Sequence, residues 1–192
     1  MMKKYIAGVV ILAVLFPLAG AEKSPGGFRQ VISCDSKYDL QPTFPRTQSR
    51  FLTHVKGGGV KGNCYFLVCP PQLKNIRINC GKYPSIPIED SSLILYCSVY
   101  LKGKAQGRFG FFCYDEKKKI FYPNPSPGRG FKINSDKWQK FTFTYVPEAG
   151  ILYSRKIRFV QPYVSIQTGG RLYIDELVQE IESNHKEIVI SQ

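Results

Sequence analysis

The sequence has little of what catalytic centres and metal sites are commonly built from. Its only histidines are His54 and His185, and no two cysteines are separated by just two residues, so the usual ligand pattern of a zinc site is missing. It also contains no Gly-x-Ser-x-Gly, His-Glu-x-x-His or P-loop motif. These absences remove the local signatures of serine hydrolases, zinc proteases and P-loop nucleotide-binding enzymes.

Acidic residues are scarce as well, with 14 Asp and Glu against 27 Lys and Arg. Several occur as close pairs: Asp35/Asp39, Glu89/Asp90, Asp115/Glu116 and Asp175/Glu176. Adjacent residues on a strand point to opposite faces, so a doublet does not make a general acid/base pair. We interpret these residues as parts of solvated turns and strand ends, and His54 as a surface histidine. An enzyme whose site is assembled from scattered residues stays open.

No long apolar run follows the first 21 residues, so no transmembrane helix is expected in the mature chain. Residues 1–21 have the three regions of a signal peptide: Lys3 and Lys4, an apolar stretch, and the small residues Ala19-Gly20-Ala21. An uncleaved anchor is the alternative. No cysteine follows the cleavage site, which argues against a lipid anchor. We therefore expect a secreted or periplasmic protein, with one domain at 22–180 and a polar tail at 181–192.

The predicted mature chain is strongly basic, with 25 basic and 14 acidic residues and a net charge of +11. Such a charge favours anionic partners such as acidic polysaccharide, the cell envelope or nucleic acid, without choosing among them. The alternative is a dispersed basic surface that serves solubility. The chain shows no specific nucleic-acid-binding feature, and its oligomeric state does not follow from the sequence.

Six cysteines lie in the mature part: Cys34, Cys64, Cys69, Cys80, Cys97 and Cys113. An even number in an exported chain predicts up to three disulfides, which six cysteines can form in 15 ways.

Short β-like runs separated by turn residues dominate the chain, and helical periodicity is absent. The expected strands are residues 28–33, 50–55, 64–68, 75–79, 93–101, 108–114, 138–146, 155–160, 163–167 and 171–178. Their number and spacing predict an all-β fold, a β-sandwich or jelly roll stabilised by disulfides.

Alternation assigns faces to two of these strands. Leu93, Leu95, Cys97, Val99 and Leu101 share one side of the first, and Phe109, Phe111 and Cys113 share one side of the second. If a turn centred on Ala105 joins the strands, antiparallel pairing sets Cys97 opposite Cys113, within reach of a disulfide. A hairpin centred on Gln72 would likewise pair Cys64 with Cys80, which leaves Cys34 with Cys69 by elimination. A one-residue change in either turn would overturn these pairings.

The face opposite the aliphatic side is rich in aromatic residues and carries Tyr96, Tyr100, Arg108, Phe112 and Tyr114. Sugar rings present apolar C–H faces that pack on aromatic side chains, and tyrosine adds a polar hydroxyl. These five residues are the candidate carbohydrate-binding platform. The alternative is that the face is a second packed layer, because Tyr and Phe are common strand residues.

Four segments carry a family resemblance: Ser92-Leu-Ile-Leu-Tyr-Cys-Ser-Val-Tyr-Leu-Lys, Gly107-Arg-Phe-Gly-Phe-Phe-Cys-Tyr-Asp, Trp138-Gln-Lys-Phe-Thr-Phe-Thr-Tyr-Val-Pro and Gly170-Arg-Leu-Tyr-Ile-Asp-Glu-Leu. Their order and spacing over about residues 90–180 resemble the carbohydrate-binding-module jelly rolls of the galactose-binding-like superfamily. The most similar group is associated with cellulases and xylanases, and similar domains precede polysaccharide lyases.

The resemblance implies an accessory glycan binder without catalytic activity. It also implies a packing role for Trp138 and a structural Ca²⁺ at Asp175, although the N-terminal acidic partner usual in the family is not evident near residues 27–29. With the positive charge, it predicts an exported carbohydrate-binding domain for an acidic polysaccharide, with Arg108 and the Lys117–Lys119 turn available to anionic groups. A polysaccharide-processing enzyme and an adhesion protein without sugar recognition are the alternatives.

Overall fold

The structure is a computed structural model that describes residues 21–24, 27–44, 46–80, 86–87, 93–121, 127–145 and 159–183. The predicted signal peptide, apart from Ala21, and residues 184–192 of the predicted tail lie outside this part. Within the described residues, no helix is long and apolar enough to cross a membrane. The elements are β1 (Ala21–Ser24), β2 (Gly27–Ile32), β3 (Leu40–Phe44), the 3₁₀ helix η1 (Arg46–Phe51), β4 (Leu52–Val55), β5 (Cys64–Val68), β6 (Asn75–Cys80), β7 (Ile86–Pro87), β8 (Leu93–Tyr114), β9 (Ile120–Phe121), β10 (Gly128–Tyr145), β11 (Phe159–Gln167) and β12 (Arg171–Ser183).

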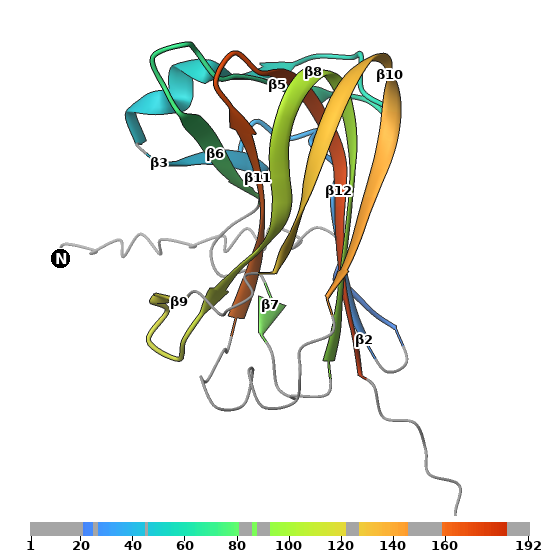
Figure 1. The fold of residues 1–192 in the computed structure, drawn as a ribbon. Helices are drawn as coiled ribbons and strands as arrows, with labels where there is room; N and C mark the ends of the chain where they lie inside the picture. Colours follow the sequence, from blue (N-terminus) through green and yellow to red (C-terminus); the bar gives the residue numbers. More distant parts are fainter. Residues whose placement is uncertain are drawn as a thin grey trace, which may run out of the picture.

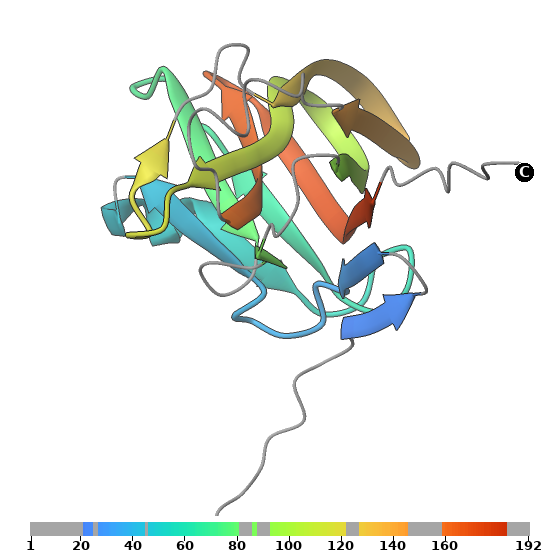
Figure 2. The same ribbon diagram turned by 90° about the horizontal axis from the view of Figure 1, so that it is seen from below.

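All of these strands pair antiparallel in one continuous sheet. The main order is β1-β2-β12-β8-β11-β6-β3, while β10 and β9 pair with β8, β7 pairs with β11, and β5 pairs with both β4 and β12. The sheet folds over into a sandwich that approaches a barrel, with β2 and β12 in one layer and β11, β6 and β3 in the other (Figures 1 and 2). The predicted all-β sandwich is confirmed.

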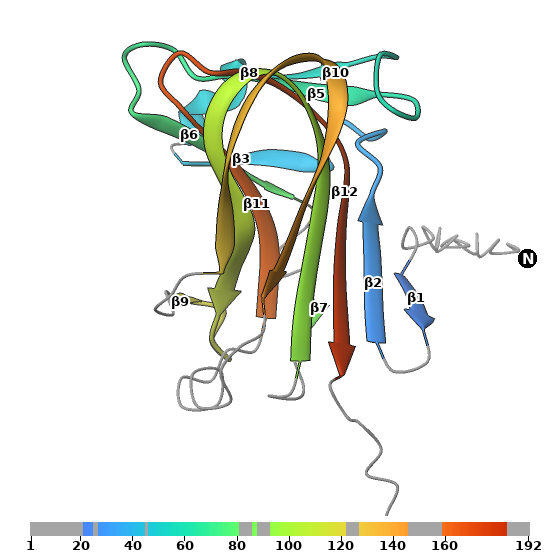
Figure 3. The ribbon, with the colours of Figure 1, turned by 45° about the vertical axis from the view of Figure 1, so that its right-hand side comes forward.

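Two long strands, β8 and β10, join the layers by arching from one into the other (Figure 3). The first half of β8 pairs with β12, and its second half pairs with β11. β10 follows β8 along both halves, and its register is irregular between Ser135 and Gln139 at the top of the arch. We call this turning region of β8 and β10 the crest.

The crest depends on Gly103. Its φ of 130° lies in a region that residues with side chains rarely adopt, and a Cβ there would lie 2.4 Å from the carbonyl oxygen of Arg171. β8 can therefore bend closely past β12 because residue 103 has no side chain.

Alternation along β8 fills the core as the sequence predicts. Leu95, Val99 and Leu101 in the first half, and Phe109 and Phe111 in the second, are at most 1% exposed and belong to the main core cluster. Burying a side chain of this size contributes about 1.5–3 kcal/mol. The period-two pattern therefore fixes which face of the strand points inward.

The predicted hairpin between residues 93–101 and 108–114 is wrong, because β8 is a single strand. Its glycine-rich middle bends but does not reverse, since it stays paired with β10 on one side and with β11 or β12 on the other. Cys97 and Cys113 therefore lie in opposite halves of the arch and cannot form the predicted cross-strand disulfide.

The other two predicted disulfides are also wrong. β5 pairs with β4 and β12, whereas β6 pairs with β3 and β11, so no hairpin sets Cys64 opposite Cys80. Cys34 and Cys69 are separate buried thiols, and the sulfur of Cys69 lies 3.6 Å from the carbonyl oxygen of Leu73. Among the cysteines whose side chains the structure describes, all five are unpaired: Cys34, Cys64, Cys69, Cys97 and Cys113.

Candidate functional site

The five residues of the predicted platform do not share one surface. All lie on the side of β8 that faces away from the main core, but the arch separates them. Tyr96 and Tyr100 lie on the half that pairs with β12, whereas Arg108, Phe112 and Tyr114 lie on the half that pairs with β11. The two halves face different surroundings and have to be considered separately.

Phe112 and Tyr114 belong to a second buried cluster with Tyr163 of β11. The rings of Phe112 and Tyr163 stack with centroids 4.6 Å apart, and the Tyr114 hydroxyl donates a hydrogen bond to Gln161 Oε1 at 2.7 Å. The three aromatic side chains are 5% exposed or less. This half of the platform is the packed layer that the sequence left as the alternative, and it offers no open aromatic surface.

Two arginines complete this cluster. The guanidinium carbon of Arg77 lies 5.0 Å from the ring centroid of Phe112 and 5.5 Å from that of Tyr163, in cation–π contact with both. Arg108 donates a hydrogen bond from Nη2 to the carbonyl oxygen of Gly128 at 2.9 Å. Burial raises the pKa of the Tyr163 hydroxyl, and the positive charges of the two arginines act in the opposite direction. Arg108 is thus engaged with groups of the protein itself.

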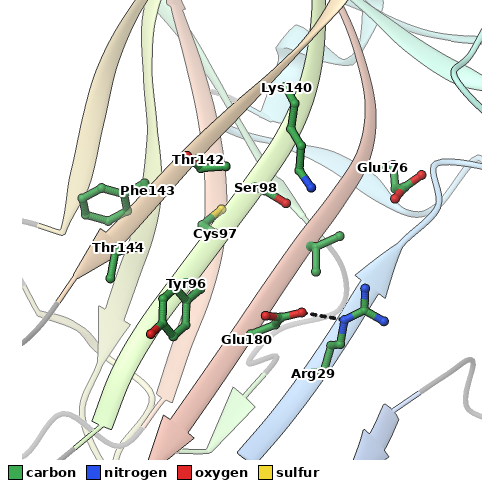
Figure 4. A pocket seen from close by; sticks show the side chains of 11 residues that line it. Arg29, Tyr96, Cys97, Ser98, Lys140, Thr142, Phe143, Thr144, Glu176 and Glu180 are labelled. Carbon is green, nitrogen blue, oxygen red and sulfur yellow. Dashed lines mark hydrogen bonds and ion pairs between the residues drawn. The ribbon is translucent and has the colours of Figure 1, made fainter.

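Tyr96, in the other half, lines a pocket of about 230 Å³ between β2, β12, β8 and β10. Figure 4 shows this pocket, with Lys140 reaching in from β10 and Arg29 joined to Glu180 by an ion pair of 2.5 Å. Its other polar lining residues are Ser98, Thr142, Thr144 and Glu176. We call it the side pocket; it combines two aromatic rings, those of Tyr96 and Phe143, with hydroxyl and charged groups.

A larger hollow of about 780 Å³ lies at the crest, and we call it the crest groove. It lies where β5, β12, β8 and the irregular stretch of β10 come together. Its lining residues are Phe66, Lys102, Gly103, Lys104, Asn134, Ser135, Asp136, Arg171 and Tyr173.

An aromatic row runs along the crest groove. Phe66 pairs with Tyr173, and Tyr173 pairs with Lys102, so antiparallel pairing sets these side chains next to one another on one face. The ring centroids of Phe66 and Tyr173 are 4.5 Å apart. Lys102 Nζ lies 4.9 Å from the Tyr173 centroid and 4.8 Å from the Trp138 centroid. The lysine is therefore held between two aromatic rings.

Trp138 reaches this position from the irregular stretch of β10. Ser135 Oγ accepts a hydrogen bond from the backbone N–H of Lys137 at 3.1 Å, which keeps the bulged chain turned. The Trp138 side chain is half-buried. It packs on Lys102 and still presents part of its surface to solvent, so packing is only one of the roles that its position permits.

Positive charge dominates the crest groove. Lys102, Lys104 and Arg171 line it, against the single carboxylate of Asp136. Lys104 and Arg171 are exposed. The ion pairs found among the described residues, Arg29–Glu180 and Lys61–Glu176, involve none of these groups. The charges of Lys104 and Arg171 therefore face solvent and can meet an anion.

Tyr100 lies between the crest groove and the side pocket. Residues 96, 98, 100 and 102 alternate onto the same face of β8, and an extended segment of this length covers about 20 Å. Lys140 links the two hollows, because its Nζ lies 5.7 Å from the Tyr100 centroid and its side chain also lines the side pocket. We call the surface formed by the crest groove, Tyr100 and the side pocket the outer strip.

Asp175 is fully buried and does not fit the expected calcium site. Its Oδ2 accepts hydrogen bonds from the backbone N–H groups of Val60 at 2.6 Å and Lys61 at 3.3 Å, and its Oδ1 accepts one from Glu176 at 2.7 Å. Burial raises the pKa of Asp175, and these hydrogen bonds oppose that change. N–H donors surround an anion in this way and would repel a cation. Within the described residues, no group of three acidic, histidine or cysteine side chains is arranged to hold a metal.

The acidic pairs that the structure describes are engaged in local structure. Asp39 accepts a hydrogen bond from the backbone N–H of Ser36, Asp35 accepts one from Asn63, and Asp115 accepts one from Lys119. His54 is half-buried, not the surface histidine that we expected, and its Nε2 lies 3.0 Å from the carbonyl oxygen of Cys34. Asp35, Asp39 and Asp115 thus serve turns, as expected, whereas the buried Asp175 does not; Glu89 and Asp90 lie outside the described residues.

No family model and no curated protein sequence matches the chain. Solved structures with a similar fold do. The CBM22-1 xylan-binding domain of Paenibacillus barcinonensis Xyn10C matches with a TM-score of 0.53 and 11% identity over 84% of this chain and 99% of that domain. The CBM22-1–GH10 modules of Clostridium thermocellum xylanase 10B, complexed with xylohexaose, match with a TM-score of 0.53 and 11% identity over 81% of this chain and 28% of that chain.

The chain has the fold of carbohydrate-binding modules. At 11% identity the match establishes a jelly-roll-like β-sandwich, which confirms the family resemblance at the level of the fold. The match with the two-module xylanase covers little more than a quarter of the xylanase chain.

Of the platform predicted from the sequence, Tyr96 and Tyr100 lie on the outer strip; the crest groove was not predicted. Phe66, Lys102 and Tyr173 come from three strands whose neighbours along the sheet could not be assigned without the topology. One signal was available: Lys102 follows Tyr100 by two residues and therefore lies on the same face of the strand.

Proposed function

We propose that this protein is a non-catalytic carbohydrate-binding module that binds an acidic polysaccharide along the outer strip. The observation that carries the proposal is the aromatic row of the crest groove, in which Phe66, Tyr173 and Trp138 flank Lys102 beside an open hollow. The carbohydrate-binding-module fold supports the same function.

The aromatic row supplies what a sugar ring needs. The C–H faces of a pyranose are apolar and pack on flat aromatic surfaces, while its hydroxyls require hydrogen-bonding groups nearby. Phe66 and Tyr173 provide such surfaces in the groove, and Trp138 adds one next to it, across Lys102. Asn134, Ser135 and Asp136 provide polar groups in the groove. Because the outer strip continues past Tyr100 to the side pocket, it can take several consecutive sugar units of one polymer.

The charges of the crest groove favour an acidic sugar. Carboxylate and sulfate groups form charge-assisted hydrogen bonds with lysine and arginine, which are stronger than neutral hydrogen bonds. Lys104 and Arg171 are exposed at the rim of the groove and available for such bonds. The net charge of +11 expected for the mature chain would also attract an anionic polymer from a distance.

A binding role also fits the acidic groups. Sugar hydrolysis commonly requires two carboxyl groups facing each other across the bond that is cut. Among the lining residues, the crest groove has the single carboxylate of Asp136, and the side pocket has Glu176 and Glu180, which form ion pairs with Lys61 and Arg29. We further propose that the protein works outside the cytoplasm, released after removal of the predicted signal peptide.

Native affinity electrophoresis tests the proposal. Because the protein is basic, the gels are run toward the cathode with polygalacturonate, alginate, chondroitin sulfate or neutral xylan in the matrix. We expect retardation by at least one acidic polymer. The double variant Lys104→Ala/Arg171→Ala should lose most of this retardation, whereas the charge-matched control Lys117→Ala/Lys119→Ala should keep it. If both double variants lost retardation equally, the polymer would be attracted by the overall charge alone.

The alternatives give different results in related assays. A polysaccharide lyase or hydrolase would release unsaturated products or reducing ends from the uronate polymers, and any such turnover contradicts a purely binding role. An adhesion protein without sugar recognition would migrate unchanged in every gel. Retardation by xylan alone would support the module and contradict its preference for acidic polymers.

A further inference from the structure

Two strands meet end to end along one edge of β12. β8 occupies the other edge along most of the length of β12. On the free edge, β2 pairs as far as Ile32 opposite Leu177, and β5 pairs as far as Tyr65 opposite Ile174 (Figure 3). Only Asp175 and Glu176 of β12, in the irregular part of that strand, lie between these two paired stretches; Cys34 follows Ile32 by two residues and Cys64 precedes Tyr65 by one. The topology therefore directs both cysteines to the same place.

Hydrogen bonds hold the two segments together at this junction. The backbone N–H of Asn63 donates to Asp35 Oδ1 at 3.1 Å, and Asn63 Nδ2 donates to the Asp35 carbonyl oxygen at 3.1 Å. The Tyr65 hydroxyl donates to the Ser36 carbonyl oxygen at 2.6 Å. The residues that directly follow Cys34 are thus bonded to the residues on either side of Cys64.

The thiols themselves share one buried environment. Cys34 and Cys64 are both 0% exposed. Burial raises the pKa of the Cys34 thiol, and the nearby charges of Asp175, Asp39 and Cys64 raise it further. Burial and Asp175 likewise raise the pKa of Cys64. The charge of the Asp175 carboxylate thus acts on both thiols, which agrees with their position beside this stretch of β12.

The backbone at Cys34 is also unusual. Its φ of 61° lies in the left-handed region, which cysteine rarely adopts. The His54 ring next to its carbonyl oxygen and the contacts of the following residues hold it there. Conformations of this kind persist where the surroundings enforce them, commonly at sites with a specific role.

We propose that Cys34 and Cys64 form a disulfide when the protein folds in an oxidising compartment. The two thiols lose two protons and two electrons, and the electrons pass to a small-molecule or protein disulfide, which is reduced to two thiols. The bond would tie β2 to β5 across the junction and close a loop of 30 residues. This inference does not depend on carbohydrate binding.

The pairing differs from every pairing that the sequence suggested. It follows from β12, which brings together two cysteines separated by 30 positions in the sequence. Cys97 and Cys113 lie in opposite halves of the arch, and Cys69 lies at the far end of β5 from Cys64. Among the five cysteines with described side chains, the structure directs only Cys34 and Cys64 to a common neighbour.

Peptide mapping without reduction tests the bond. The mature protein is refolded with reduced and oxidised glutathione, alkylated, and digested with trypsin and then chymotrypsin. Trypsin leaves Cys34 in residues 30–37 and Cys64 in residues 62–74; chymotrypsin then separates Cys64 from Cys69. We expect one linked peptide joining Cys34 to Cys64, present in the Cys69→Ser variant and absent in Cys34→Ser. Alkylated Cys34 and Cys64, or a link from either to another cysteine, would overturn the proposal.

Thermal unfolding supplies a second measurement on the wild-type protein. A cross-link closing a loop of this length should raise the unfolding midpoint by about 10 °C over the reduced protein. The difference should vanish in Cys34→Ser/Cys64→Ser and remain in Cys69→Ser. Equal midpoints for oxidised and reduced wild type would contradict the bond, whether or not the protein binds a polysaccharide.

Discussion

Under the proposed function, Trp138, next to the crest groove, is the side chain whose removal should weaken glycan binding most. It stands half-buried on a bulge, with Lys102 Nζ 4.8 Å from its ring centroid. Trp138→Ala should lower the affinity for an acidic polysaccharide by about tenfold or more, a loss of about 1.4 kcal/mol. Because the bulge is largely exposed, the unfolding free energy should change by only about 1 kcal/mol or less. Affinity electrophoresis and urea unfolding measure the two effects.

Phe112→Ala provides the matched control. Phe112 is buried between Tyr163 and Arg77, away from the outer strip. Its truncation should destabilise the fold by about 3 kcal/mol or more because it leaves a cavity. The protein that remains folded should be retarded by the same polysaccharide as the wild type. A large loss of affinity with unchanged stability would instead move the binding site to the β11 side of the arch.

Asp175 makes stability depend on pH in a definite direction. Since its pKa is raised in the folded protein, the folded state holds this proton more tightly than the unfolded state. Its contribution to stability is therefore fully present below the unfolded pKa and is lost as the pH rises through the folded value. Asp175→Asn removes this dependence. In urea unfolding, the stability advantage of the wild type over Asp175→Asn should shrink from pH 3 to pH 6. An advantage that grows would show that folding lowers the pKa of Asp175.

Among the elements, the arch of β8 sets the geometry of the site. Gly103→Ala would place a methyl group against the carbonyl oxygen of Arg171 in a conformation that alanine rarely adopts. It should cost about 3 kcal/mol or more. Gly169→Ala is the comparison, because its φ of 75° is also positive but the space around it is open, so strain alone should cost about 1–2 kcal/mol. If both variants lost the same stability in thermal unfolding, the close approach of β8 to β12 at Gly103 would contribute nothing.

The sequence predicts individual strands better than their pairing. Residues 64–68 are a strand with the expected bounds, and the inward face of β8 is the expected one. The join between residues 101 and 108 was not predictable, because a glycine-rich segment suits both a tight turn and a bend, and its pairing with β10 and β11 decides between them. The break expected between residues 160 and 163 is likewise absent, because β11 runs without interruption from Phe159 to Gln167.

The same limit applies to the candidate site. Alternation placed Tyr96 and Tyr100 away from the core, and the structure confirms their side of the strand. It could not show that Phe112 is covered, because cover depends on Tyr163 and Arg77 from strands distant in the sequence. Alternation also could not predict the contact between Phe66 and Tyr173, because that contact arises from the pairing of β5 with β12.

For the molecule as a whole, charge and aromatic contacts should contribute separately to binding. Exposed charges are screened beyond about 8 Å at physiological ionic strength and more strongly at higher salt. Raising NaCl from 0.15 to 0.5 M should weaken retardation by an acidic polymer without abolishing it, since the aromatic row still packs on the sugars. In Trp138→Ala the same salt step should abolish it. Complete loss in the wild type would mean that attraction is only electrostatic.

A glycan array probed in parallel with the mature wild-type protein and Trp138→Ala tests the central claim most directly. The array carries neutral, uronate-containing and sulfated glycans, and is read at 0.15 M NaCl. The account predicts that the wild type binds acidic glycans and that Trp138→Ala loses most of this signal. Absence of binding by the wild type, or equal binding by both proteins, would contradict glycan recognition at the crest groove.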